Sequence, residues 1–121
     1  MSKNKIFGDK GEKLAYKYLI SKGYKILETN WFFNKKEIDI ICIKNKELII
    51  VEVKTRSSDY FGMPEEAVNF KKQQFLIEAT QNYIEKNNIN LDTRFDVISI
   101  ILNKNKTEIK HIKDAFNPNI I

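Results

Sequence analysis

The sequence predicts a mixed α/β domain in which helices flank a central sheet, and three observations support this fold class. Apolar residues recur at helical spacing over residues 8–22, and they do so again over residues 69–86. Between and after these two segments lie runs rich in Ile and Val, which are typical of buried strands. Because the chain has 121 residues, we expect a single domain over residues 1–121.

Each predicted helix carries one apolar stripe and an end signal. The stripe of the first helix follows the spacing i, i+3, i+4, i+7, i+8 and consists of Gly11, Leu14, Ala15, Tyr18 and Leu19. Gly23 is placed to end this helix, because glycine adopts the left-handed backbone of a C-terminal cap at low cost. The stripe of the second helix consists of Phe75, Leu76, Ala79 and Tyr83.

The remaining segments are expected to supply the sheet. Extended backbone is predicted at residues 24–34, 38–43, 48–56, 95–102 and 108–112. Polar turns are expected at residues 44–46 and 103–106, and a loop at residues 57–64. The chain order is therefore helix, three strands, helix, two strands.

Composition narrows the class of protein. The formal net charge is +5, which suits a polyanion such as nucleic acid, although a general bias toward Lys, Asn and Ile explains it as well. No apolar run approaches the roughly 20 residues that span a bilayer, and the first residues do not resemble a secretory signal. Cys42 is the only cysteine and is expected in the core. We therefore expect a cytoplasmic protein without a membrane partner.

Two neighbouring predicted strands hold charges among apolar residues. Asp39 interrupts one apolar run, and Glu52 and Lys54 interrupt the next. A charge inside such a strand costs several kcal/mol unless it is paired or coordinated. If the hairpin is centred on Asn45 and Lys46, residues whose numbers add up to about 91 lie opposite each other, so Asp39 faces Glu52 at about 4.5–5.5 Å between Cβ atoms. Lys54 shares the face of Glu52 because side chains two apart on a strand point the same way.

This trio suggests chemistry. Two carboxylates so close repel each other unless a proton or a cation lies between them, and Mg²⁺ is the hard cation that oxygen ligands prefer. Such an ion can bind a phosphate and activate a water molecule, while an adjacent ammonium offsets developing charge. The sequence therefore predicts a metal-dependent nuclease site at Asp39, Glu52 and Lys54. The alternative is a buried salt-bridge cluster that only shapes the core.

The wider pattern resembles the YraN-like proteins, an uncharacterised family related to Holliday-junction resolvases, within the restriction-endonuclease-like superfamily. The central motif, Glu37-Ile38-Asp39 followed by Val51-Glu52-Val53-Lys54, is similar to the PD-(D/E)xK signature of that superfamily. Further matching segments are Gly8-Asp9-Lys10-Gly11-Glu12, Gly23-Tyr24, Asn30, Thr55-Arg56-Ser57, Phe61-Gly62, Pro64 to Val68, Lys72, Arg94 to Ile98 and His111-Ile112. The resemblance covers nearly the whole chain.

The resemblance implies an αβββαβ endonuclease-like core and a site for Mg²⁺ (or Mn²⁺). By this resemblance, Asp39 and Glu52 are metal ligands, Lys54 is the catalytic lysine and Glu12 is a further ligand from the first helix. The alternative for Glu12 is an acid near a helix N-terminus that interacts favourably with the helix dipole. The chain departs from the family at Lys36, where Gly is usual, and at Phe32, where Arg is usual, and both departures affect substrate contacts more than metal binding.

Other polar and aromatic residues have two interpretations each. Arg56, Lys36 and Lys72 are candidates for contacting phosphates, against surface salt bridges or a solvated helix face. Trp31, Phe32 and Phe33 are expected to be core or interface residues, with stacking on bases as the alternative. His111 is expected at the surface rather than as a general base.

Three hypotheses follow for function. The first is a metal-dependent endonuclease that acts on DNA, including branched or structured DNA. The second is a non-catalytic nucleic-acid-binding protein of the same fold. The third is a small interaction subunit that uses residues 31–33 as its contact patch. A homodimer is a further expectation for the nuclease, because cutting two strands takes two sites.

Overall fold

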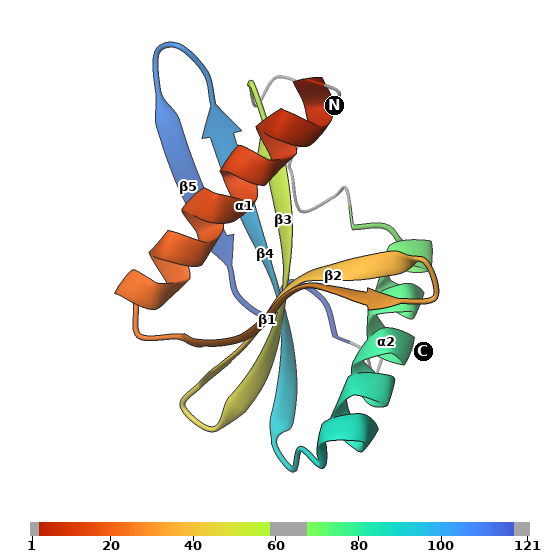
Figure 1. The fold of residues 1–121 in the computed structure, drawn as a ribbon. Coiled ribbons are helices and arrows are strands. Elements are labelled where there is room, and N and C mark those ends of the chain that lie inside the picture. The colour runs from red at the N-terminus through yellow and green to blue at the C-terminus, as the bar shows by residue number, and fades with distance from the viewer. Residues whose placement is uncertain (1–2, 59–67, 118–121) are drawn as a thin grey trace.

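The computed structural model describes residues 3–58 and 68–117 and confirms the α/β fold class (Figure 1). The elements follow the predicted order. They are α1 (Lys3–Ser21), β1 (Lys25–Phe33), β2 (Lys36–Lys44), β3 (Glu47–Arg56), α2 (Phe70–Asn87), β4 (Asp92–Leu102) and β5 (Thr107–Ile112). Within the described ranges, no helix is long and apolar enough to cross a membrane.

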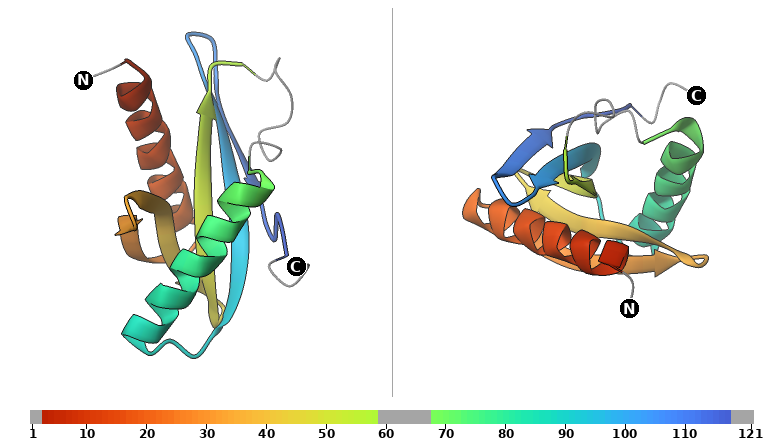
Figure 2. Two further views of the ribbon diagram at one scale, coloured as in Figure 1. Left: turned by 90° about the vertical axis from the view of Figure 1, so that its right-hand side faces the viewer. Right: turned by 90° about the horizontal axis from the view of Figure 1, so that it is seen from above.

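The five strands form one mixed sheet in the order β1-β2-β3-β4-β5. Strands β3 and β4 are parallel, with α2 as the crossover between them, and the other neighbours are antiparallel. Figure 2 shows the two helices on opposite faces of the sheet. Ala15 and Leu19 of α1 pack on one face, and Leu76 and Tyr83 of α2 pack on the other. Each face of the central strands is therefore covered, which explains their nearly continuous apolar sequence.

The ends of the helices partly differ from the prediction. Helix α1 begins at Lys3 rather than at Gly8, and Lys5 and Asp9 form an i,i+4 ion pair across its extra turn at 3.5 Å. Helix α2 begins where predicted, because the Asn69 side chain accepts a hydrogen bond from the backbone N–H of Lys72 at 2.9 Å. It ends at Asn88, which has a left-handed backbone with φ of 52°.

The β2–β3 hairpin has the predicted register. Asn45 and Lys46 form its turn with φ values of 52° and 64°, and the pairs run from Lys44 opposite Glu47 to Ile40 opposite Val51. The ladder ends there, one pair before Asp39 and Glu52. Beyond this point β2 stays paired with β1, while β3 stays paired with β4 (Figure 1). The two strands therefore diverge at the position where the charges begin.

Helix α1 lies unusually close to β3 at Gly11. A Cβ atom added at Gly11 would overlap the Thr55 hydroxyl and stand 2.8 Å from Thr55 Cβ. Only a residue without a side chain allows this approach. Because Glu12 is the next residue, the close contact also determines how near its carboxylate comes to the sheet.

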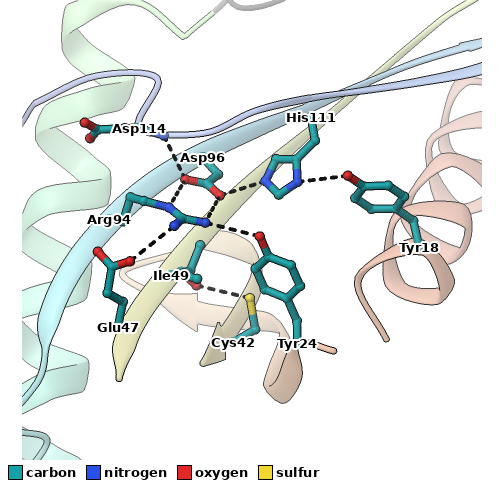
Figure 3. A network of polar contacts seen from close by, with 9 residues as sticks. All are labelled: Tyr18, Tyr24, Cys42, Glu47, Ile49, Arg94, Asp96, His111 and Asp114. Atoms are coloured by element: carbon teal, nitrogen blue, oxygen red, sulfur yellow. Dashed lines mark hydrogen bonds and ion pairs between the residues drawn. The ribbon is translucent and has the colours of Figure 1, made fainter. Parts of the chain in front are cut away.

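A buried network centred on Asp96 joins β4 to β5 (Figure 3). The Arg94 guanidinium donates to both Asp96 oxygens at 2.9 Å, His111 Nε2 lies 2.7 Å from Asp96 Oδ2, and the Asp114 backbone N–H donates at 3.0 Å. The prediction that His111 lies at the surface is wrong, since its side chain is 4% exposed. A lone histidine in a polar sequence context gives no sign that its partner lies on another strand.

The same network reaches the C-terminal half of α1. Tyr18 OH lies 3.2 Å from His111 Nδ1, and Arg94 donates to Tyr24 OH and to Glu47 at 3.2 Å. Burial disfavours the charged form of Asp96, but the hydrogen bonds from His111, Arg94 and the backbone hold the pKa of this carboxyl below its usual range. The network thus fixes α1 at one end while Gly11 fixes it nearer the other.

Gly11→Ala is expected to lower the free energy of unfolding by about 1–3 kcal/mol, because the new methyl group displaces α1 from Thr55. Gly8→Ala is the matched control, since a Cβ there meets nothing within 4 Å. It should raise stability by about 0.5–1 kcal/mol through helix propensity. Urea unfolding measures both. Equal effects of the two changes would contradict the close approach.

Asp96→Asn is expected to lower stability at pH 7 by about 2–3 kcal/mol, because Arg94 loses its buried carboxylate partner and keeps only Glu47 as an acidic partner. The pKa of Asp96 is depressed by folding, so its contribution is complete above the pKa of the unfolded chain and is lost as pH falls through the folded pKa. The difference between wild type and variant should therefore shrink in acid. Urea unfolding between pH 3 and pH 7 tests this, and a difference independent of pH would contradict it.

Candidate active site

The candidate site lies where β2 and β3 separate. The β2–β3 ladder ends at Ile40 of β2, and Asp39 is the residue that precedes Ile40 in the chain. With no β2 carbonyl opposite it, the backbone N–H of Val53 donates instead to Asp39 Oδ2 at 2.8 Å. The Asp39 carboxylate thus bridges the opening and comes close enough to Glu52 for the two charges to interact, although the predicted cross-strand pair of Asp39 and Glu52 is absent from the ladder.

Glu52 is buried, with 3% of its surface exposed, and its partner comes from α2. Lys72 Nζ lies 3.0 Å from Glu52 Oε2. No hydrogen bond of regular geometry reaches that oxygen from residues 3–58 or 68–117. An isolated buried carboxylate is costly, so the Lys72 ammonium is the charge that offsets it within the described chain.

Asp39 and Glu52 are electrostatically in conflict. Burial, and then the adjacent Glu52, raise the pKa of the Asp39 carboxyl well above its usual range, while the Val53 N–H opposes this shift. The charged form of Asp39 is therefore unfavourable unless a cation lies close to it. The fold therefore keeps a strained pair at the point where it could have placed apolar residues.

Asp39 also belongs to a cluster of three carboxylates. One ligand oxygen each from Glu12, Glu37 and Asp39 lies within 4.8 Å of the other two. Asn30 donates from Nδ2 to Glu12 at 2.6 Å and to Glu37 at 3.0 Å. Its backbone is left-handed with φ of 49°, a strained conformation that is common beside functional sites. A single amide group thus holds two acids in place beside the third.

Glu12 does not act as a helix N-terminal acid. Because α1 begins at Lys3, Glu12 lies well inside the helix, beyond the first turn where the dipole acts. Burial raises the pKa of the Glu12 carboxyl, and the charges of Glu37, Asp9 and Glu52 add to this, against the Asn30 hydrogen bond. Of the two interpretations of Glu12, the structure removes the dipole one and leaves the carboxylate beside Asp39.

The predicted lysines occupy different surroundings. Lys54 lies half-buried on β3, where it is paired with Ser99 of β4, and its ammonium forms no ion pair or hydrogen bond with any described residue. Lys36 of β2 and Lys72 of α2 both lie near the Phe75 ring, each with its Nζ 5.6 Å from the ring centre. Arg56 is half-buried at the end of β3. The candidate phosphate contacts Lys36 and Lys72 are thus brought together.

The aromatic run of β1 is mostly structural. The Trp31 ring packs edge-on to Tyr83 with centres 5.1 Å apart, and Phe33 packs near Phe75 at 6.3 Å. Phe32 faces outward and is 67% exposed. The expectation of core packing is therefore met by two of the three aromatic residues.

Cys42 is buried as predicted, and burial raises the pKa of its thiol to about 12.

Sequence reasoning missed two features of the site. It placed Glu37 in a motif but gave it no role, although a residue two positions before Asp39 shares its face in a strand. It considered Lys72 as a phosphate contact or as part of a solvated helix face, whereas the lysine is paired with Glu52. Nothing in the local sequence indicates that pairing, because it depends on how α2 crosses the sheet.

The donor set fits a hard divalent cation. All ligand atoms of the cluster are carboxylate oxygens, and they converge from α1 and β2. The predicted ligand Glu52 lies beside Asp39 but outside this cluster, and its Oε2 faces the Lys72 ammonium. A bound cation would offset the negative charge of Asp39, whose pKa is raised first by burial and then by Glu52. The arrangement can therefore hold an ion such as Mg²⁺ or Mn²⁺ and present it to an anionic ligand.

Comparison with known proteins places the chain among close relatives. The family model described as uncharacterised protein family UPF0102 matches residues 11–100. A UPF0102 protein of Flavobacterium psychrophilum is 46% identical over 116 residues, which make up 96% of this chain and 98% of the relative. A UPF0102 protein of Clostridium botulinum is 51% identical over 116 residues, covering 93% of this chain and 95% of the relative. These matches confirm the resemblance to the YraN-like proteins.

Asp39→Asn is expected to stabilise the metal-free protein at pH 8 by about 1–2 kcal/mol, because it removes the repulsion with Glu52. The raised pKa means that the wild type is penalised above the folded pKa and recovers stability as pH falls toward the unfolded pKa. The advantage of the variant should therefore fade by pH 4.

Thermal or urea unfolding in the presence of a chelator measures this, with Asp92→Asn as the control at an exposed aspartate. A variant less stable than wild type at pH 8 would contradict the prediction, because it would show that the Asp39 carboxylate stabilises the fold.

Proposed function

This chain belongs to the uncharacterised protein family UPF0102, and because that name states no activity, we propose a function from the site itself. The proposed function is a metal-dependent endonuclease that hydrolyses phosphodiester bonds in DNA, including branched or structured DNA. One observation carries the proposal. The Asp39 carboxylate is held beside the buried Glu52 at the divergence of β2 and β3, with a lysine two residues further along β3.

In this proposal Asp39, Glu52 and Glu12 would hold Mg²⁺ or Mn²⁺, and Glu37 is close enough to join them. Such an ion, when bound, supplies Lewis-acid activation of the phosphate and a more acidic water. The repulsion between the Asp39 and Glu52 carboxylates supports this role, because a bound cation would reduce it. Sites of this kind commonly retain strain that the rest of the fold must support.

Lys54 has the position of a catalytic group. It shares the strand face of Glu52, and its ammonium is not engaged by any residue in the described ranges. During hydrolysis a water oxygen bonds to phosphorus, the bond to the leaving oxygen breaks, and negative charge grows on the phosphate oxygens. A lysine ammonium that is not committed to a protein carboxylate can orient the water and offset that charge.

The other basic groups suit the approach of a nucleic acid. Lys36 and Lys72 flank Phe75 on the α2 side of the site, and Arg56 lies at the end of β3. The chain carries a net charge of +5, which attracts a polyanion over a distance. We assign these three residues to backbone phosphates. Their contribution should fall with rising salt concentration.

The second candidate function is non-catalytic nucleic-acid binding by the same fold. One observation favours it, because Lys72 already places a positive charge on Glu52. An ammonium in that position competes with a metal ion for the same carboxylate. A homodimer belongs to the first candidate only, since double-strand cleavage requires two sites.

The proposal is tested with linear, flapped and four-way DNA in 5 to 10 mM Mg²⁺ or Mn²⁺, concentrations on the order of those that occupy weak carboxylate sites. Asp39→Asn and Lys54→Ala should each lower the cleavage rate by about 100-fold or more, because each removes a group that acts on the transition state. Lys71→Ala is the matched control, an exposed lysine beside the paired Lys72.

Calorimetric titration with Mn²⁺ separates the two candidates. The endonuclease requires binding in the wild type that is lost in Asp39→Asn. Absence of binding at millimolar Mn²⁺, together with salt-sensitive DNA binding, would replace the first candidate by the second. Cleavage that survives both Asp39→Asn and Lys54→Ala would overturn the assignment of the site.

A further inference from the structure

Helix α1 has a second face that is not used by the core. The residues Lys5, Asp9, Glu12, Lys13 and Tyr16 recur at helical spacing and line one pocket together with Thr29, Asn30, Asp39 and Ile40. The apolar stripe through Ala15 and Leu19 packs on the sheet instead. The pocket has a volume of about 600 Å³, within the range of sites for small molecules and large enough for a nucleotide. The carboxylates of Glu12 and Asp39 form part of its wall.

Tyr16 is the aromatic group of this pocket. It lies four residues after Glu12, slightly more than one helical turn or about 6 Å along the axis, and 39% of its surface is exposed. Its ring contacts no other ring and its hydroxyl forms no hydrogen bond among the described residues. By contrast, Tyr18, Tyr24 and Tyr83 are all hydrogen-bonded and packed. Tyr16 therefore presents a ring that the fold itself does not use.

The charges of the pocket determine what can enter it. Lys5 pairs with Asp9 at 3.5 Å, and Lys13 adds an exposed lysine to the lining. The carboxylates of Glu12 and Asp39 in the same lining repel an anion unless a cation covers them. A phosphate can therefore occupy the carboxylate end only through the metal ion of the proposed function, and the uncharged base is the part of a nucleotide that suits the Tyr16 end.

We propose that this pocket binds the unpaired nucleotide next to the scissile phosphate, with its base stacked on Tyr16. This rests on the proposed function for the position of the phosphate. One helical turn between Glu12 and Tyr16 is a span that a single nucleotide can bridge. A base within a duplex is covered on both faces by its neighbours and cannot lie on a protein ring. The site thus selects DNA with unpaired nucleotides, such as single strands, flaps or branch points.

The test uses an oligonucleotide with one 2-aminopurine, whose fluorescence is quenched when it stacks on an aromatic ring. The protein is titrated with single-stranded and with duplex forms in Ca²⁺, a hard cation that occupies oxygen sites. Tyr16→Leu should weaken single-strand binding about tenfold and abolish the quenching, since stacking on a base typically contributes that much. Tyr16→Phe should keep both, because the ring and not the hydroxyl is needed.

Phe32→Leu is the matched control, because Phe32 is more exposed than Tyr16 but does not line the pocket. It should bind and quench like the wild type. Thermal unfolding of the three variants checks that each is folded. Duplex binding should be unaffected by Tyr16→Leu.

The possible outcomes separate this inference from the proposed function. If Tyr16→Leu binds and quenches like wild type while the wild type cleaves DNA in Mg²⁺, the pocket assignment is wrong and the nuclease stands. If Tyr16-dependent binding is found but no cleavage, the inference stands and the non-catalytic candidate is favoured. If the wild type shows no preference for unpaired DNA, the inference is overturned.

Discussion

The feature on which the rest of the site depends is the close approach of two carboxylates, Asp39 and Glu52, at the point where β2 and β3 part. Burial, and then the adjacent Glu52, raise the pKa of Asp39, while the Lys72 ammonium lies 3.0 Å from Glu52. The pairing of β2 with β1 and of β3 with β4 fixes the backbone positions from which the two side chains extend. The stability of the whole sheet therefore supports an arrangement that is unfavourable for the Asp39 charge.

Two sets of contacts position helix α1, which supplies Glu12 to the site. Gly11 allows the helix to touch β3, and the network of Arg94, Asp96 and His111 ties the far end of the same helix to β4 and β5. Between these two points the helix has little freedom to shift. Glu12 is therefore delivered to Asp39 by packing that lies outside the site, and its position depends on residues that never contact a ligand.

The sequence was most informative where local periodicity and turn geometry decide the structure. The left-handed Asn45 and Lys46 fix the hairpin register, so the neighbourhood of Asp39 and Glu52 followed from counting residues. The sequence was least informative where distant segments meet. The burial of His111 against Asp96 arises from the pairing of β5 with β4, and the pairing of Lys72 with Glu52 arises from the position of α2 on the sheet. No local pattern encodes either contact. For Glu12 the sequence left two interpretations open, because the choice between them depended on the residue at which α1 begins.

Acidic and basic groups are separated between the two faces of the sheet, and this separation bears on how metal and nucleic acid would bind. The α1 side holds the carboxylates of Glu12, Glu37 and Asp39, while Lys36 and Lys72 lie on the α2 side. A net charge of +5 draws a polyanion toward the whole molecule, yet the acidic cluster repels phosphate locally. In the proposed nuclease, a divalent ion would reverse that local repulsion. Binding of metal and of nucleic acid would then be mutually dependent, because each supplies the charge that the other needs.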